Sequence, residues 1–283
     1  MDGVIIIDKP KGCTSHDIVH KVKKITGEKV GHTGTLDPLA TGVLPILVGV
    51  GTKISKYLIE HDKTYEVVLQ LGEKTTTGDA EGELVETQAI PELDNETIQN
   101  VLQARIGKQW QTPPVYSAIK VKGKKLYEYA RKGQEVEIPK REIDIYSITL
   151  QDYCKQTQQV AFTVSCSKGT YIRSLCETIA EDLHTVGYMK ELRRTQVGRF
   201  TLEHAISIDA LDSMENHVYG IEQLFQHCPN YILPANKQEL FFNGVQLHVE
   251  QPDGVVRVYT QEKIFVGLAT VQQQRLKRDV LLG

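Results

Sequence analysis

Short apolar runs and helix-spaced apolar positions follow one another along the first part of the chain. The run GVIIID, from Gly3, is short, β-branched and ended at once by turn residues, which predicts a buried strand. Four apolar residues from Ile18 to Ile25 then recur at the spacing of one helical face. We expect Ser15 to cap this helix at its N-terminus and Gly27 to end it.

The alternation of strand-like and helix-like patterns continues through the next fifty residues. Val43–Val48 predicts another buried strand, and Thr64–Leu71 alternates as a half-buried strand does. Lys53–Ile59 predicts a short helix, and the amphipathic stretch Asp94–Ile106 predicts a longer one. The polar, turn-rich stretch TTTGDAEG, from Thr75, is typical of a loop.

Strand pairs dominate the pattern further along the chain. Ile143 to Leu150 predicts a strand interrupted by a slip or bulge, and Gln159–Cys166 predicts its neighbour. Thr170–Leu183 has the clearest helical spacing, and Gly187 is expected to close that helix. Because strands and helices alternate irregularly, we expect an α+β fold with a mixed, largely antiparallel central sheet flanked by helices.

The pattern of apolar and polar residues changes at two places along the chain. Residues 111–138 show little apolar periodicity, and we interpret them as a protruding loop with a short helix inside an otherwise continuous domain, 1–229. From about 230 to 283 a short helix at Lys237–Phe242 precedes an Asn-Gly turn and several short β-like runs. These features predict a small β-rich C-terminal module.

Composition narrows the class of protein. The 283 residues are 40% hydrophobic and 24% charged, with a net charge of −3, which is ordinary for a globular protein. The five cysteines are scattered and form no CxxC pair, which favours reduced thiols. The N-terminal apolar run is cut short by Asp8, and the longest apolar stretch is too short to span a bilayer. We therefore expect a soluble, cytoplasmic, monomeric protein without a membrane partner.

One stretch contains far too much turn chemistry for a regular element. From Gly31 to Pro45 the sequence GHTGTLDPLATGVLP places three glycines and two prolines around Asp37. A stiff loop can hold a catalytic carboxylate in place, although an Asp-Pro turn can also serve only its own backbone. No phosphate-binding glycine loop and no metal-ligand spacing accompanies it, so we expect neither a cofactor nor a metal.

Two other stretches offer possible partners for this carboxylate. The segment from Lys168 to Arg173 runs into the clearest helix and places Arg173 in its first turn. Arg173 is either a surface cation or, if it faces Asp37, a partner that holds the carboxylate ionised and oriented. Tyr65, at the start of a predicted strand, is either a half-buried sheet residue or a functional aromatic.

Positive charge is concentrated in two places. Six basic residues against one acidic residue lie between Lys120 and Lys132, with tyrosines among them, as an RNA that offers phosphates and unstacked bases would require. The basic residues of the two clusters are Lys120, Lys122, Lys124, Lys125, Arg131 and Lys132, and Lys190, Arg193, Arg194 and Arg199. Each cluster alone could be a solvated face, but both in a slightly acidic chain favour an anionic partner.

Six stretches in this order resemble the TruB-type tRNA pseudouridine synthases and cover most of the first 200 residues. They are DKPKGCTSHD from Asp8, KVGHTGTLDPLATGVLP from Lys29, KTYEVVLQLGEKTTTGDAEG from Lys63, TPPVYSAIKVKGKKLYEYARKG from Thr112, SKGTYIRSL from Ser167 and LRRTQVGRF from Leu192. The resemblance implies the pseudouridine synthase fold and an enzyme that isomerises uridine 55 in the T loop of tRNA.

The resemblance also implies roles for individual residues. Asp37 would be the catalytic aspartate, with Arg173 as its ion-pair partner. Tyr65 would stack on the flipped base, and His32 would occupy the vacated position in the T loop. Further implied residues are Leu192, Lys9 and Pro10 around the active site, and Asp79, Tyr116, Lys120, Lys122, Lys124, Lys125, Arg131, Arg193 and Arg194 for the RNA.

The resemblance further implies that residues 112–133 form a thumb that closes over the T-stem loop, and that 230–283 form a PUA-like RNA-binding module. No metal or organic cofactor is implied. Whether Asp37 attacks C6 of the base, attacks C1′ of the sugar or takes a sugar proton stays open, as does the group that removes the C5 proton, with Tyr65 a candidate. A non-catalytic tRNA chaperone and a glycosidase-like hydrolase are the alternative functions; a hydrolase normally needs two carboxylates.

Overall fold

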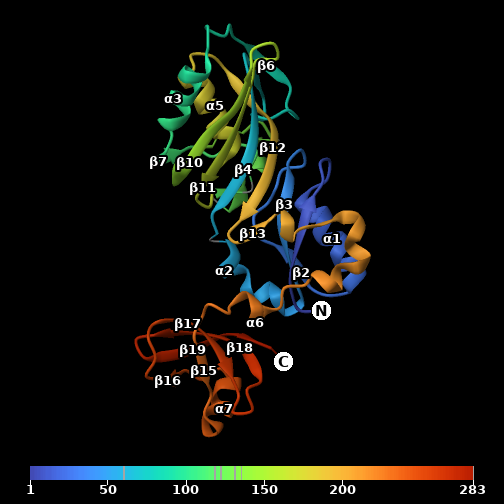
Figure 1. Ribbon diagram of the computed structural model, residues 1–283, viewed down its shortest axis with the longest axis vertical. Helices are drawn as coiled ribbons and strands as arrows, with labels where there is room; N and C mark the ends of the chain where they lie inside the picture. Colours follow the sequence, from blue (N-terminus) through green and yellow to red (C-terminus); the bar gives the residue numbers. More distant parts are fainter. Residues whose placement is uncertain (60, 118, 122, 131, 135, 283) are drawn as a thin grey trace.

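A long mixed sheet is the central element of the molecule (Figure 1). The computed structural model describes residues 1–59, 61–117, 119–121, 123–130, 132–134 and 136–282. Ten strands make the main sheet, with the order β14-β1-β3-β12-β4-β11-β10-β7 and with β2 and β13 at its sides. Neighbours are antiparallel except β1–β14 and β3–β12. The expected α+β fold with a largely antiparallel sheet is therefore confirmed.

The strands of the main sheet come from residues 3–207. They are β1 (Gly3–Lys9), β2 (Val30–His32), β3 (Thr41–Val48), β4 (Lys63–Leu71), β7 (Gly107–Gln111), β10 (Arg141–Cys154), β11 (Gln159–Cys166), β12 (Gly187–Val197), β13 (Phe200–Thr201) and β14 (Ile206–Ser207). A small hairpin, β5 (Glu73–Thr75) and β6 (Leu84–Thr87), follows β4.

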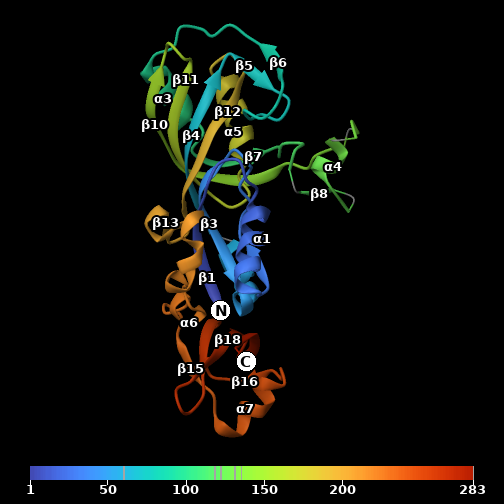
Figure 2. The same ribbon diagram turned by 90° about the vertical axis from the view of Figure 1, so that its right-hand side faces the viewer.

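The helices lie beside the main sheet, in the segment that extends sideways from it and in the C-terminal part of the chain (Figures 1 and 2). They are α1 (Ser15–Thr26), α2 (Ser55–Ile59), α3 (Asn95–Gln103), α4 (Leu126–Ala130), α5 (Ile172–Asp182), α6 (Ile221–Leu224) and α7 (Ala235–Phe242), with 3-10 segments at Gly49–Ile54, Leu202–His204 and Ile208–His217. No helix in the described ranges is long and apolar enough to cross a membrane.

The expected cap of α1 is wrong by one residue. Thr14, not Ser15, is the N-cap: its hydroxyl accepts from the backbone of Asp17, whose carboxylate accepts from the backbone of Thr14. The acidic residue three positions after Thr14 was the signal for this arrangement. The Ser15 hydroxyl is thereby free for a second task at the candidate site. Gly27 ends the helix in the left-handed conformation, as expected.

The strand β12 is the main element that the sequence pattern did not predict. Gly187 does not close α5, which ends at Asp182; it begins this eleven-residue strand. Because most of its half-buried positions carry polar residues, the segment looks like a charged surface in the sequence. In the sheet it lies between β3 and β4, so it joins the two halves of the main sheet. The predicted bulge in β10 is confirmed between Ile145 and Ser147.

The insertion expected to protrude does so. It contains the two-residue strands β8 (Lys120–Val121) and β9 (Lys124–Lys125) and then α4, and it extends sideways from the sheet in Figure 2. Its root is tied to α5: the Gln111 side chain bonds the backbone N–H and C=O of Tyr171 at 2.8 and 2.9 Å, and Ser174 donates to Thr112. The first residues of the insertion are therefore held in place by hydrogen bonds to Tyr171 and Ser174.

The C-terminal module has its own sheet and shares a core with the rest of the protein. Its strands are β15 (Asn230–Ile232), β16 (Leu247–His248), β17 (Gly254–Tyr259), β18 (Phe265–Gln272) and β19 (Arg275–Leu281), in the order β15-β17-β18-β19-β16. Leu268 and Val280 pack in one cluster with Val4 and Ile6 of β1. The Asp279 carboxylate accepts from Lys56 and Tyr57, each at 2.7 Å, and from the hydroxyl of Thr270.

Asp279 is expected to stabilise this junction in a pH-dependent manner. Burial raises the pKa of Asp279, but the hydrogen bonds from Lys56, Thr270 and Tyr57 outweigh burial and hold the pKa below its ordinary value. A lowered pKa contributes stability that is present above the unfolded-state value of about 3.9 and is lost as the pH falls through the folded-state value. Asp279→Asn should lower the free energy of unfolding by about 2 kcal/mol at pH 7.

Urea unfolding at pH 7 and below pH 4 measures this difference, which should shrink in acid. The exposed Asp152, in β10, provides a matched control. Asp152→Asn should change stability by less than about 0.5 kcal/mol at either pH. An Asp279 variant as stable as the wild type at pH 7 would contradict the assignment.

Candidate active site

The loop between β2 and β3 carries Asp37 and is held at several points. The Ser15 hydroxyl accepts from the backbone N–H of Leu36 at 2.8 Å and donates to its carbonyl at 3.1 Å. The carbonyl of Pro38, two residues after Leu36, accepts from the backbone N–H of Gly12 at 2.9 Å and from Lys9 Nζ at 3.3 Å. The backbone on both sides of Asp37 is therefore fixed by the segment that follows β1.

The buried side chain of Lys9 supports the loop that carries Asp37. The Lys9 side chain is 0% exposed, and Nζ also donates to the carbonyls of Cys13 at 2.7 Å and Pro10 at 2.9 Å. Burial lowers the pKa of Lys9. Pro10 itself is exposed and contributes only its carbonyl. Three carbonyls satisfy the three donors of the ammonium group, which explains how this side chain can be buried.

Arg173 faces Asp37 from the first turn of α5. Its Nε lies 3.1 Å from Asp37 Oδ2, and Nη2 lies 3.5 Å from Oδ1, so the guanidinium meets both carboxylate oxygens. Nη2 also donates to the carbonyl of Tyr116 at 2.9 Å, and Nη1 donates to that of Thr77 at 3.2 Å. One guanidinium thus joins the Asp37 loop to the root of the insertion.

Asp79 is a buried carboxylate beside Arg173. It is 4% exposed, its Oδ2 lies 3.8 Å from Arg173 Nη1, and its Oδ1 accepts from the Thr77 hydroxyl and the Glu81 backbone. This burial does not fit the RNA contact expected from the sequence. The position is that of a second carboxylate that holds Arg173.

The protonation of Asp37 depends on opposing effects. Burial raises the pKa of Asp37, the Arg173 guanidinium opposes this rise, Asp79 adds to it, and Lys9 opposes it. The sequence-based expectation considered only the arginine. Because burial is the largest effect and the net direction is upward, the ion pair with Arg173 is what keeps the ionised form accessible.

Asp37, Tyr65 and Arg173, far apart in the sequence, line one cavity of about 440 Å³. Tyr65, from β4, is 6% exposed, and Leu192, from β12, and Tyr116 complete the walls. Burial raises the pKa of the Tyr65 phenol, and the Arg194 guanidinium opposes the rise. The sequence analysis missed the lining residues Lys63, Tyr171 and Met189. Met189 belongs to the strand that was not predicted, whereas Lys63 and Tyr171 lie in stretches that the sequence analysis singled out without proposing either as a site residue.

His32 is at the end of β2 and does not line this cavity. It is half-buried, and within the described part of the chain its Nδ1 has no hydrogen-bond partner. Burial, followed by the nearby Arg194 and His16 charges, lowers the pKa of His32, so the ring is neutral at pH 7. A neutral imidazole offers a flat stacking surface without a charge to desolvate.

The cations expected to bind RNA have different surroundings. Lys124 is exposed on β9; Lys120 and Lys125 belong to β8 and β9, but their side chains lie outside what the structure describes, as do Lys122 and Arg131 altogether. Arg193 pairs with Asp8 at 2.8 Å and remains partly exposed. Arg194 is 1% exposed, so the expected phosphate contact at Arg194 does not fit its position.

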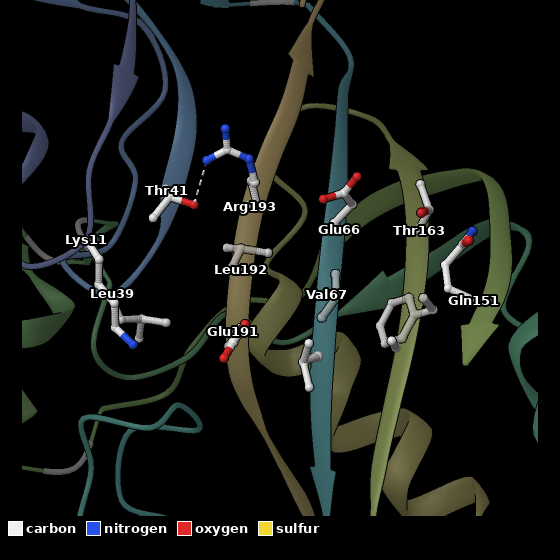
Figure 3. Close-up of a pocket in the computed structure, with 13 residues that line it drawn as sticks. Lys11, Leu39, Thr41, Glu66, Val67, Gln151, Thr163, Glu191, Leu192 and Arg193 are labelled. Carbon is white, nitrogen blue, oxygen red and sulfur yellow. Dashed lines mark hydrogen bonds between the residues drawn. The ribbon is translucent and has the colours of Figure 1, made fainter. Parts of the chain in front are cut away.

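A second cavity, of about 550 Å³, lies over another part of the sheet (Figure 3). Its walls include the carboxylates Glu66 and Glu191, with Lys11 and Leu39 on the opposite side. Leu192 borders both cavities. Neither Asp37 nor Arg173 lines this space, so the two groups that form the ion pair belong to the smaller cavity alone.

Comparison with known proteins gives the family of the chain. The sequence model of the TruB family pseudouridylate synthase N-terminal domain matches residues 22–172, and that of the tRNA pseudouridylate synthase B C-terminal domain matches 173–236. The tRNA pseudouridine synthase B of Bacillus subtilis (strain 168) is 44% identical over 277 residues, 94% of this chain and 89% of that protein. That of Caldanaerobacter subterraneus subsp. tengcongensis is 40% identical over 280 residues, 98% of each.

Among solved structures, a chain of a Cbf5-Nop10-Gar1 complex superposes with a TM-score of 0.71 at 25% identity, over 99% of this chain and 84% of that one. The similarity therefore extends over the whole fold, including the strand β12 and the C-terminal sheet. With a family model across more than half of its length and full-length relatives at 40% identity or above, the chain belongs to the TruB family of pseudouridylate synthases.

Proposed function

We propose that the protein converts uridine 55 in the T loop of tRNA to pseudouridine, with Asp37 as the reacting carboxylate. That the chain is a tRNA pseudouridine synthase rests on its family and on the names of its full-length relatives. The observation that carries the finer proposal is the Asp37–Arg173 ion pair at the wall of a cavity that also holds Tyr65 and Leu192. An oriented, half-buried carboxylate at the wall of a partly apolar cavity suits covalent or proton-transfer chemistry on a flipped base.

The surroundings of Asp37 suit a base that has left its stack. Extrusion of a nucleotide costs a few kcal/mol, and aromatic contact offsets part of this cost. Tyr65 offers such a surface inside the cavity, and His32, outside it, could support the loop that the base has left. Leu192 excludes water on the apolar side. Asp37 is then free to act on the uracil or its sugar while the ring detaches, turns and rejoins through C5.

The hydrolase alternative is weakened by the position of the second carboxylate. A glycosidase normally places two carboxyl groups on either side of the scissile bond. Asp79 is the candidate for this second carboxyl group, but it is buried beside Arg173 and does not line the cavity. A chaperone function would need only the binding surface, which does not account for an ion pair between Asp37 and Arg173 in the cavity wall.

Asp37→Asn is expected to abolish turnover and to leave tRNA affinity within about tenfold, because phosphate contacts carry most of the binding. The assay uses a T-loop RNA with 5-tritiated uridine. The wild type should release tritium with no change of RNA mass and no free uracil. Free uracil would indicate a hydrolase, bound but unchanged RNA would indicate a chaperone, and equal loss of rate and affinity in the variant would exclude the nucleophile role.

Arg173→Met tests the electrostatic part of the proposal. Arg173 opposes the rise in the Asp37 pKa, so its removal should raise that pKa further. The acid limb of the single-turnover rate should then move to higher pH, with a loss of about 100-fold at pH 7. Arg105→Met removes another ion pair, 2.6 Å from Arg105 Nη2 to Asp182 Oδ2, whose two residues do not line the cavity of Asp37, and should leave the pH profile as it is.

The insertion is proposed to bind tRNA through its lysines. Replacing Lys122, Lys124 and Lys125 together with Ala should weaken binding and reduce the slope of log affinity against log salt by about one for each phosphate that is no longer bound. Filter binding between 50 and 200 mM salt, roughly the range in which such contacts dominate, measures the slope. Lys155→Ala, at the β10–β11 turn, is the control. An unchanged slope in the triple variant would exclude the insertion as a phosphate-binding element.

A further inference from the structure

Arg194 has the largest fully buried side chain in the described part of the molecule. It follows Arg193 on β12, and successive strand residues point to opposite faces of a sheet. Figure 3 shows Arg193 directed toward Thr41, with Nη1 3.3 Å from its hydroxyl. Arg194 points the other way, toward the cavity that holds Asp37. The side chains of these two adjacent arginines therefore point to opposite faces of the sheet.

The guanidinium of Arg194 connects both ends of the Asp37 loop. Its Nε donates to the carbonyl of Val43 at 2.8 Å, and its Nη2 donates to the carbonyl of Gly34 at 2.9 Å. The eight residues between these carbonyls include Asp37. The backbone of Arg194 also pairs with Gly42, where a Cβ would lie 2.1 Å from the Arg194 carbonyl oxygen. The loop end is therefore pressed against β12 and held there from both backbone and side chain.

The charge of Arg194 has no carboxylate partner. Among the described residues, no Asp or Glu oxygen lies within 4.0 Å of its nitrogens, whereas Arg173 and Arg193 both have such partners. An unpaired buried cation is costly, and backbone carbonyls offset only part of that cost.

Arg194 faces the Tyr65 phenol, and its charge also adds to the lowering of the pKa of His32 and of Lys9. Burial raises the pKa of this phenol, and the Arg194 guanidinium opposes the rise. Cys166, from β11, and Asp37, from the loop, also face the phenol, and both add to the rise. Arg194 is therefore the cation that limits how far the phenol is held in its neutral form.

We propose that Arg194 is a positioning residue for pseudouridine formation, which fixes the Asp37 loop at both ends and holds a cation beside Tyr65. It does not touch the RNA; it acts through Asp37 and Tyr65. A wholly structural arginine would be replaceable by an apolar residue without an effect on the chemistry of the cavity. The proposal rests on the proposed function, so the first requirement is tritium release by the wild type, without which the proposed function itself fails.

Three variants separate the two effects. Arg194→Met removes the charge and both hydrogen bonds, and Arg194→Lys keeps the charge but cannot reach two carbonyls at once. Val197→Ala, in a different core cluster but on the same strand, is the control for loss of stability alone. For each variant we would measure tRNA affinity, the single-turnover rate across pH, and amide hydrogen exchange of residues 34–43 in the free protein.

In Arg194→Met the rate should fall about 100-fold, because a displacement of roughly 1 Å at a reacting group has an effect of this size. Its tRNA affinity should stay within about threefold, since the side chain is buried. Exchange in 34–43 should accelerate, and any limb of the pH profile that depends on Tyr65 should move to higher pH. Arg194→Lys should show the faster exchange and a loss of about tenfold, with the wild-type pH profile; Val197→Ala should show none of these changes.

A wild-type rate in Arg194→Met would overturn the proposal, as would an unchanged pH profile in that variant. A loss of affinity without a loss of rate would return Arg194 to the role of a phosphate contact. If Arg194→Met does not fold, Arg194→Lys tests the proposal through amide hydrogen exchange of residues 34–43 and the single-turnover rate. Wild-type values of both would exclude that Arg194 holds the loop at the carbonyls of Gly34 and Val43.

Discussion

The contact between Asp37 and Arg173 sets the requirement that the rest of the site meets. Burial pushes the Asp37 carboxylate toward its neutral form, and the Arg173 guanidinium, close to both oxygens, is the strongest opposing charge, with Lys9 second. The cation must itself be held, which Asp79 and the carbonyls of Thr77 and Tyr116 do. The orientation of the Asp37 carboxylate therefore depends on groups beyond the two that form the ion pair.

These supports come from every part of the catalytic domain. Ser15, Gly12 and Lys9 hold the loop around Asp37 from the segment after β1, and Arg194 holds its ends from β12. Arg173 reaches it from α5, whose N-terminus is tied through Gln111 to the root of the insertion. The root of the insertion is thus connected to the carboxylate through a short series of hydrogen bonds. The C-terminal module is fixed to the same frame, because β18 and β19 share a core with β1 and Asp279 joins β19 to α2.

Much of this arrangement was predictable from the sequence, because its signals are local. Turn residues marked the Asp37 loop, helical spacing placed Arg173 in a first turn, and apolar runs marked β1, β3 and β11. The site residues Asp37, Arg173 and Tyr65 were nominated partly by such signals and partly by family resemblance. Thr14 could have been recognised as the cap of α1 from the acidic residue three positions on.

The face to which each side chain of β12 points was decided only by the tertiary structure. The strand is polar at most half-buried positions, so its pattern resembles a charged surface, and burial of Arg194 depends on carbonyls contributed by Gly34 and Val43. Likewise, Asp79 looks like an exposed loop residue until Arg173 covers it. The sequence by itself determined the rigid loop and its carboxylate. Which cations reach it, and which merely face solvent, was settled by strand order, a property of contacts between distant segments.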